Sequence, residues 1–123
     1  MIRKEEEPLS LQDMIGNEYL FEVYHLEDMD DVKGIFNPIS AVYVFTRLSR
    51  NRMGPYTHEL IYCGETGDLS NRFDHPDHHK EPNIRSRRAN CICVLCVPPE
   101  ERKQVEKDIL TNNHFSCNIQ LNS

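Results

Sequence analysis

Two apolar segments in the middle of the chain constrain its fold more than any other feature. "AVYVFTR" at 41–47 and "ELIYCG" at 59–64 are rich in β-branched and aromatic residues, and the polar stretch between them contains a Gly-Pro pair. They predict two antiparallel strands joined as a hairpin. If the turn is centred near residues 52–53, Tyr43 lies opposite Tyr62, and the two phenols share one face. In this register the other face carries Val42, Val44, Ile61 and Cys63.

Two further segments predict strands of the same sheet. "NEYLFEVYHLED" at 17–28 alternates aromatic and β-branched residues with polar ones, and "NCICVLCV" at 90–97 is an unbroken apolar run that suits a strand buried on both faces. The order of segments predicts an α/β protein of the α+β kind, in which helices flank a small antiparallel central sheet.

Two helices are expected after these strands. "ETGDLSNRF" is a turn into a short helix from about Asp68, where Leu69 and Phe73 form an i,i+4 apolar pair for the core. Two prolines end the 90–97 strand, and a helix from about Pro99 to Thr111 follows, with acids in its first turn. Its apolar stripe is Val105, Ile109 and Leu110.

Length and composition bound the class of protein. A chain of 123 residues is large enough for one core, so we expect a single domain over 1–123. No apolar run approaches the ~20 residues of a membrane span, and the acidic N-terminus is unlike a signal peptide. The sequence therefore predicts a soluble, cytoplasmic protein without a membrane partner, whose five cysteines are reduced.

The charge is unevenly distributed along the chain. The formal net charge is −6, yet residues 1–31 hold ten acids and two bases, a balance of −8, whereas residues 32–98 hold nine bases and six acids, a balance of +3. An acidic N-terminal extension followed by a basic body is compatible with a polyanion partner such as nucleic acid. The candidate phosphate-binding residues are Arg47, Arg50, Arg52, Lys80, Arg85, Arg87 and Arg88.

The order of several short motifs resembles that of the GIY-YIG nuclease family. Ala41-Val42-Tyr43 stands where the family has Gly-Ile-Tyr, and Tyr62-Cys63-Gly64 stands where it has Tyr-Ile-Gly. "GETGDLSNRF" is similar to the family's turn and arginine-bearing helix. "VEKDIL" followed by "CN" is similar to its glutamate-bearing helix and terminal asparagine. The resemblance covers about residues 40–118 and implies a GIY-YIG endonuclease-like fold.

The resemblance implies hydrolysis of a phosphodiester bond of nucleic acid, expected to be DNA, with one divalent metal ion. Glu106 would hold the ion, Mg²⁺ or Mn²⁺, because such hard cations take oxygen ligands and retain waters. Arg72 would bind the scissile phosphate and neutralise charge in the transition state. Tyr43, with Tyr62 beside it, would be the general base or would position the attacking water. Asn118 would tether the C-terminal segment to the site.

The chain departs from the family's pattern at a few positions. Ala41 and Cys63 replace glycine and isoleucine, and both are small or apolar as a packed strand requires. Relatives often carry a histidine about one helical turn after the arginine. We assign it to His78 by matching "HHK", with His75 and His79 as alternatives, because "RFDHPDHHK" holds two extra residues. The proline usual before "CN" is absent.

Two other interpretations compete with the metal-dependent nuclease. "CICVLC" and "HPDHH" suggest zinc, but on a strand Cys91 and Cys93 face one way and Cys96 the other, so four ligands do not converge. A catalytically inactive module that binds nucleic acid or protein is the other alternative. Such a module has no need to retain the glutamate together with the tyrosine and the arginine, so we predict an enzyme.

Overall fold

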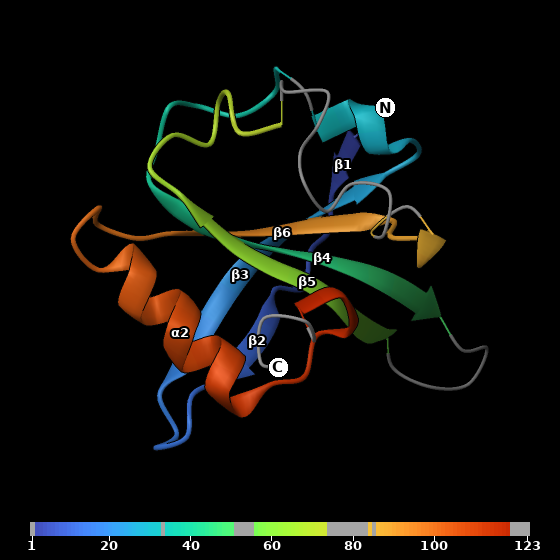
Figure 1. Ribbon diagram of the computed structural model, residues 1–123. Helices are drawn as coiled ribbons and strands as arrows, with labels where there is room; N and C mark the ends of the chain where they lie inside the picture. The colour runs from blue at the N-terminus through green and yellow to red at the C-terminus, as the bar shows by residue number, and fades with distance from the viewer. Residues whose placement is uncertain (1, 33, 51–55, 74–83, 85, 119–123) are drawn as a thin grey trace.

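A computed structural model describes residues 2–32, 34–50, 56–73, 84 and 86–118 of the protein. In these residues an antiparallel sheet of six strands is combined with α-helical and short 3-10 segments (Figure 1). The strands are β1 (Ile2–Lys4), β2 (Leu9–Gln12), β3 (Glu18–Leu26), β4 (Ala41–Arg50), β5 (Tyr56–Thr66) and β6 (Cys91–Cys96). The helices are η1 (Met29–Val32) and α2 (Arg102–Asn112). The predicted mixed α+β class with an antiparallel sheet is confirmed.

The sheet has the strand order β1-β3-β6-β4-β5, and β2 pairs with the first half of β3. β4 lies between β5 and β6 and pairs antiparallel with both, which confirms the predicted hairpin of 41–47 with 59–64. The second half of β3 pairs with β6. The acidic N-terminal segment therefore contributes three strands, β1, β2 and β3, to the sheet.

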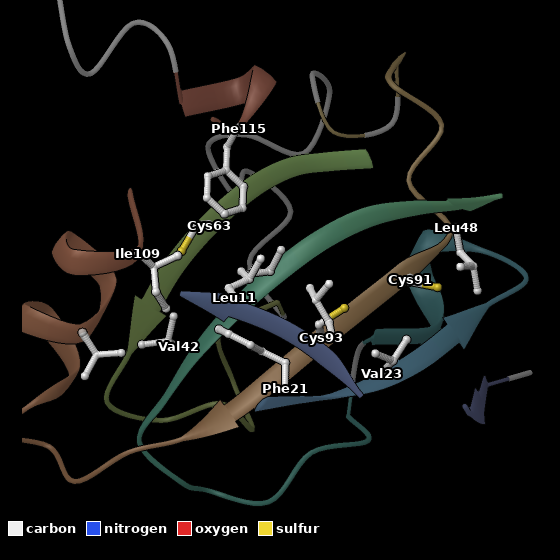
Figure 2. Packing of buried hydrophobic residues seen from close by; sticks show 13 residues of the cluster. Leu11, Phe21, Val23, Val42, Leu48, Cys63, Cys91, Cys93, Ile109 and Phe115 are labelled. Carbon is white, nitrogen blue, oxygen red and sulfur yellow. The ribbon is translucent and has the colours of Figure 1, made fainter. Parts of the chain in front are cut away.

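One face of the sheet, which we call the helix face, is covered by α2, β2 and the segment around Phe115 (Figures 1 and 2). Its core consists of Val42 and Val44 of β4, Cys63 of β5 and Cys93 of β6, packed against residues of the covering elements. α2 contributes Val105 and Ile109, as the predicted stripe requires. Figure 2 shows Ile109 and Phe115 meeting Cys63 and Val42 over β5 and β4.

The opposite face, which we call the loop face, is covered by irregular segments. The stretches 27–40 and 67–73 lie side by side over the end of the β4–β5 hairpin (Figure 1), joined by a hydrogen bond from the Leu69 amide to the Ile39 carbonyl of 2.9 Å. The buried loop-face residues include Ala41, Tyr43, Phe45, Ile61, Tyr62, Leu69, Phe73, Ile84, Ile92 and Val94. Leu69 and Phe73 enter the core, as predicted.

The register of the β4–β5 hairpin differs from the predicted one. Arg50 pairs with Tyr56 next to the turn, whereas Tyr43 pairs with Gly64, two residues beyond the predicted partner Tyr62. The Arg50–Tyr56 pair is centred on residue 53, slightly later than predicted, and an irregularity farther along β5 adds the rest of the shift. The predicted direct opposition of Tyr43 and Tyr62 is therefore wrong.

A β-bulge explains why the two tyrosines nevertheless share a face. Thr46 pairs with Leu60 and Phe45 pairs with Tyr62, so Ile61 is the extra residue. Because side chains alternate along a strand, one inserted residue reverses the faces beyond it. Without the bulge, Tyr62 would lie opposite Val44 on the helix face. With the bulge, both Ile61 and Tyr62 join the loop-face core, so placing Ile61 on the helix face was wrong.

The helices differ from the predictions at their starts. α2 begins at Arg102, because residues 99–101 form a turn in which the Glu101 amide donates to the Pro98 carbonyl at 2.9 Å. The predicted acids thus precede the first helical turn. Residues 69–73 form hydrogen-bonded turns rather than a regular helix, although the Asp68 side chain accepts from the Ser70 amide at 2.9 Å as a helix cap would. The continuation over 74–83 lies outside the described residues.

Four cysteines are buried and Cys96 is exposed, and all five are free thiols. Cys91 and Cys93 point to the helix face, as predicted from strand alternation. Within the described part of the chain, no helix is both long and apolar enough to cross a membrane.

Candidate active site

The ring of Tyr43 lies across the backbone of Gly64 on the neighbouring strand. A Cβ atom built on Gly64 would approach Cζ and the hydroxyl oxygen of Tyr43 to 2.6 Å each, and Cε2 of Tyr62 to 3.0 Å. Any side chain at position 64 would therefore displace the buried Tyr43 ring. The glycine of Tyr62-Cys63-Gly64 is required by the tyrosine of the neighbouring strand, since no other residue lets the two approach so closely.

Tyr62 lies beside Tyr43, with ring centroids 6.2 Å apart and ring planes 43° apart. Burial is the largest influence on both phenols. It raises the pKa of Tyr43 well above its ordinary value of 10.0 and raises the pKa of Tyr62 to about 12, although the nearby Arg72 charge acts in the opposite direction. Both hydroxyls therefore stay protonated at neutral pH. This favours positioning of water or phosphate by hydrogen bonds over the phenolate base that the resemblance allows.

Arg72 reaches Tyr43 from the turn that follows β5. The Asp68 amide donates to Thr66 Oγ1 at 3.2 Å, and the Asp68 carboxylate in turn accepts from the Ser70 amide, which fixes the turn locally. Arg72 Nε donates to the Tyr43 hydroxyl at 3.0 Å. A guanidinium carries four further N–H donors on its terminal nitrogens, the groups with which arginine binds phosphates in pairs.

Glu106 on α2 is half-buried and belongs to the same electrostatic cluster. It follows Val105, which enters the core, so its carboxylate lies at the border of the apolar region. Burial, and to a smaller extent the negative charge of Glu65, raise the pKa of Glu106 to about 7, although Arg72 acts in the opposite direction. The Glu106 charge also raises the pKa of Tyr62. The carboxylate, the guanidinium and the phenols are thus near enough to influence one another.

The donor set fits a hard divalent cation. A raised pKa means that the negative charge of Glu106 is poorly compensated, and a bound cation would compensate it. In the described residues, no group of three or more His, Cys, Asp and Glu side chains is placed to hold a metal. Mg²⁺ needs no such cage, because it usually keeps several waters and binds through one or two carboxylates plus a substrate phosphate.

Asn118 completes the free edge of β5. Its side-chain oxygen accepts from the Cys63 amide at 2.9 Å, and its side-chain nitrogen donates to the Cys63 carbonyl at 3.2 Å. The Asn118 backbone amide donates to the Phe115 carbonyl at 3.1 Å within the segment after α2, and the Asn118 side chain joins this segment to the strand. Asn118 thereby holds the backbone next to Gly64, where the Tyr43 ring rests.

The predicted phosphate-binding residues that lie in the described part of the chain are not gathered at this cluster. Arg47 lies four positions along β4 from Tyr43, and its guanidinium donates to the Arg88 carbonyl at 3.1 Å. Arg50 forms an ion pair of 2.7 Å with Glu5, so part of the basic surface is met by the acidic N-terminal segment. Arg87 is exposed. Outside the described residues lie Arg52, Lys80 and Arg85, and the histidines His75, His78 and His79.

Sequence reasoning missed the ion pair between Glu65 and Arg102. Arg102 Nε lies 2.7 Å from Glu65 Oε1, which ties the start of α2 to the end of β5. Arg102 also stands four residues before Glu106, the i,i+4 spacing at which charges on one helix can pair. The sequence feature that could have indicated this ion pair is the position of Glu65 directly after Gly64, at the end of a predicted strand. The Glu65 carboxylate lies near Glu106 and raises its pKa. Because Arg102 is paired with Glu65, its positive charge compensates the charge of Glu106 less.

A scan against profiles of known protein families, and searches of characterised proteins and of solved structures, found no match for this chain. What the cluster can do chemically is therefore judged from its own residues.

Proposed function

We propose that the protein is a metal-dependent nuclease of the GIY-YIG type, which hydrolyses phosphodiester bonds of nucleic acid, with DNA as the expected substrate. The observation that supports this most strongly is the electrostatic cluster at one end of the β4–β5 hairpin. There Arg72 binds Tyr43, and both Arg72 and Glu106 influence the pKa of Tyr62. A cation-binding carboxylate, a phosphate-binding guanidinium and two hydroxyl donors are the groups that this chemistry needs.

In the proposed reaction, water attacks phosphorus and the bond between phosphorus and the leaving oxygen breaks. The products are a phosphate monoester and an alcohol. Arg72 binds a non-bridging oxygen and neutralises charge that builds in the transition state. The buried Tyr43 hydroxyl accepts a hydrogen bond from Arg72 Nε and is hydrogen-bonded to Tyr62, so it orients both the guanidinium and the Tyr62 phenol for the substrate.

Tyr62, whose pKa is about 12, acts as the neutral hydroxyl donor to the substrate. Glu106 would hold one Mg²⁺ or Mn²⁺ ion, with waters and substrate phosphate as the other ligands. When bound, the ion would supply Lewis-acid polarisation of the phosphate and charge stabilisation at the leaving oxygen.

The test is cleavage of supercoiled plasmid, linear DNA and single-stranded RNA with Mg²⁺ or Mn²⁺. We expect wild-type protein to cut at least one substrate and Glu106→Gln to lose metal-supported cleavage, because the amide retains the shape without the charge. Glu101→Gln is a matched control, since it makes the same change at an exposed position just before α2. Wild-type protein that binds nucleic acid but never cuts it would show an inactive binding module instead.

A further inference from the structure

A second pocket opens on the loop face next to the proposed active site. It has a volume of about 300 Å³ and lies where the 35–39 segment passes over β3 and β6. Its lining includes Glu22, Tyr24, Phe36, Asn37, Leu69 and Cys96. The pocket thus combines two aromatic rings with a carboxylate, an amide and a thiol.

The pocket lies next to the proposed active site and shares a turn with it. Leu69, which lines it, belongs to the turn that carries Arg72. Phe36 lies 6.4 Å from Phe73, and Phe73 lies 5.1 Å from Tyr43, measured between ring centroids. The Phe36 and Tyr43 rings, between which the buried Phe73 ring packs, are therefore separated by no more than the length of about three stacked nucleotides, at a rise of ~3.4 Å for each. A strand whose phosphate is bound at Arg72 could therefore place a nearby base in the pocket.

The polar groups of the pocket suit the edge of a base. The Glu22 carboxylate is held in place by the Tyr24 hydroxyl, which donates to it at 2.9 Å, and by Lys4 Nζ at 2.9 Å. An oriented carboxylate accepts hydrogen bonds from the exocyclic amino groups of bases, as Glu does from N4 of cytosine. The same negative charge disfavours a phosphate at this position. The aromatic side chains provide surfaces that stack on any base.

We propose that this pocket binds one unstacked nucleobase of the substrate strand and prefers a base with an exocyclic amino group, such as cytosine, over uracil or thymine. This inference rests on the proposed nuclease function, because the strand is positioned by the phosphate at Arg72. The pocket would then contribute a sequence preference close to the cut.

Cys96 provides a direct measurement of occupancy. It is the one exposed cysteine, and the other four are buried, so iodoacetamide should modify Cys96 selectively. The experiment measures the rate of this alkylation by intact-protein mass spectrometry with cytidine monophosphate, uridine monophosphate, ribose 5-phosphate or inorganic phosphate. At ten times its dissociation constant, cytidine monophosphate should slow the alkylation by about tenfold. Uridine monophosphate should protect less, and the two phosphates without a base should not protect.

Variants separate stacking from recognition of the base edge. Tyr24→Ala should weaken protection by cytidine monophosphate, whereas Tyr19→Ala on the same strand should not, because Tyr19 packs against the helix-face core. If Tyr24→Ala does not fold, Glu22→Gln is the decisive variant, since an amide also donates and should remove the preference for cytidine over uridine.

The outcomes distinguish this inference from the proposed function. Equal protection by cytidine and uridine monophosphates, or none by either at saturating concentration, would overturn the base pocket even if the protein cuts DNA. Selective protection by cytidine monophosphate without any nucleic-acid cleavage would support the pocket and leave the nuclease proposal refuted.

Discussion

The close approach of Tyr43 to Gly64 makes Gly64→Ala an informative substitution. The added methyl group would lie 2.6 Å from two atoms of the Tyr43 side chain. That ring is completely buried and is held by Phe45 and Phe73 at centroid distances of 6.0 and 5.1 Å, so it cannot turn into solvent.

The expected cost has two parts. Overpacking a core costs about 1–3 kcal/mol, and displacing the hydroxyl from the charged Arg72 adds about 1.5–3 kcal/mol. We therefore expect Gly64→Ala to lower the free energy of unfolding by about 2.5–6 kcal/mol, a large part of the stability of a domain of this size.

Urea unfolding followed by far-ultraviolet circular dichroism measures this change, with tyrosine fluorescence as a second probe because the chain has no tryptophan. Gly67→Ala is the matched control, since a Cβ there would lie 3.5 Å from the Arg102 guanidinium, an ordinary contact. In a Tyr43→Ala background, Gly64→Ala should cost much less. A cost no larger than that of Gly67→Ala, or an unchanged cost in the Tyr43→Ala background, would refute the close approach.

Three other predictions concern the same cluster. Because the pKa of Glu106 is raised to about 7, protons should compete with the cation, so the affinity for Mg²⁺ measured by calorimetry should fall about tenfold for each pH unit below 7; a pH-independent affinity would contradict this. Tyr43→Phe removes the acceptor of Arg72 Nε and should lower kcat by about 10²–10³-fold, while lowering the unfolding free energy by about 1.5–3 kcal/mol, the cost of losing a hydrogen bond to a charged group. A rate within twofold of wild type would exclude the hydroxyl from catalysis. Asn118→Leu leaves the Cys63 amide and carbonyl without their side-chain partner and should destabilise the protein by about 2–4 kcal/mol in urea unfolding; an unchanged midpoint would show that water replaces the side chain.

The Glu106 pKa also sets the direction of a stability change with pH. The folded-state pKa lies above the ordinary value of 4.5, so the folded state retains a proton that the unfolded chain has lost between these values. This group therefore lowers stability as pH rises from about 4.5 to about 7, and contributes no further change above that range. Bound cation should remove this destabilisation, because it replaces the proton.

Local pattern was enough to predict most of the sheet. The apolar runs at 41–47, 59–64 and 90–97 form strands because β-branched and aromatic side chains fit a pleated, buried surface. The unbroken run at 90–97 correctly indicated a strand covered on both faces. The burial of Leu69 and Phe73 also follows from spacing alone. Strand formation and burial of this kind depend on residues that are close together in the chain, so the local sequence pattern predicts them.

The predicted site residues were found through the order of motifs, and the contacts between them were not. The sequence contains Tyr43, Arg72, Glu106 and Asn118, but it does not say that Arg72 binds the Tyr43 hydroxyl or that Asn118 caps the backbone of Cys63. Such contacts join segments 29 and 55 residues apart. They depend on how the covering segments pack, and no local spacing encodes that.

The sequence alone does not determine that Tyr43 and Tyr62 lie on the same face of the sheet. The sequence determined that two strands carry these tyrosines and that a glycine follows the second. The bulge at Ile61 was decided by the tertiary structure, and it is the bulge that turns Tyr62 toward Tyr43. A one-residue insertion reverses every face beyond it, yet its position depends on the balance of packing on both sides of the sheet. That balance exists only once α2 covers one face and the 27–40 and 67–73 segments cover the other.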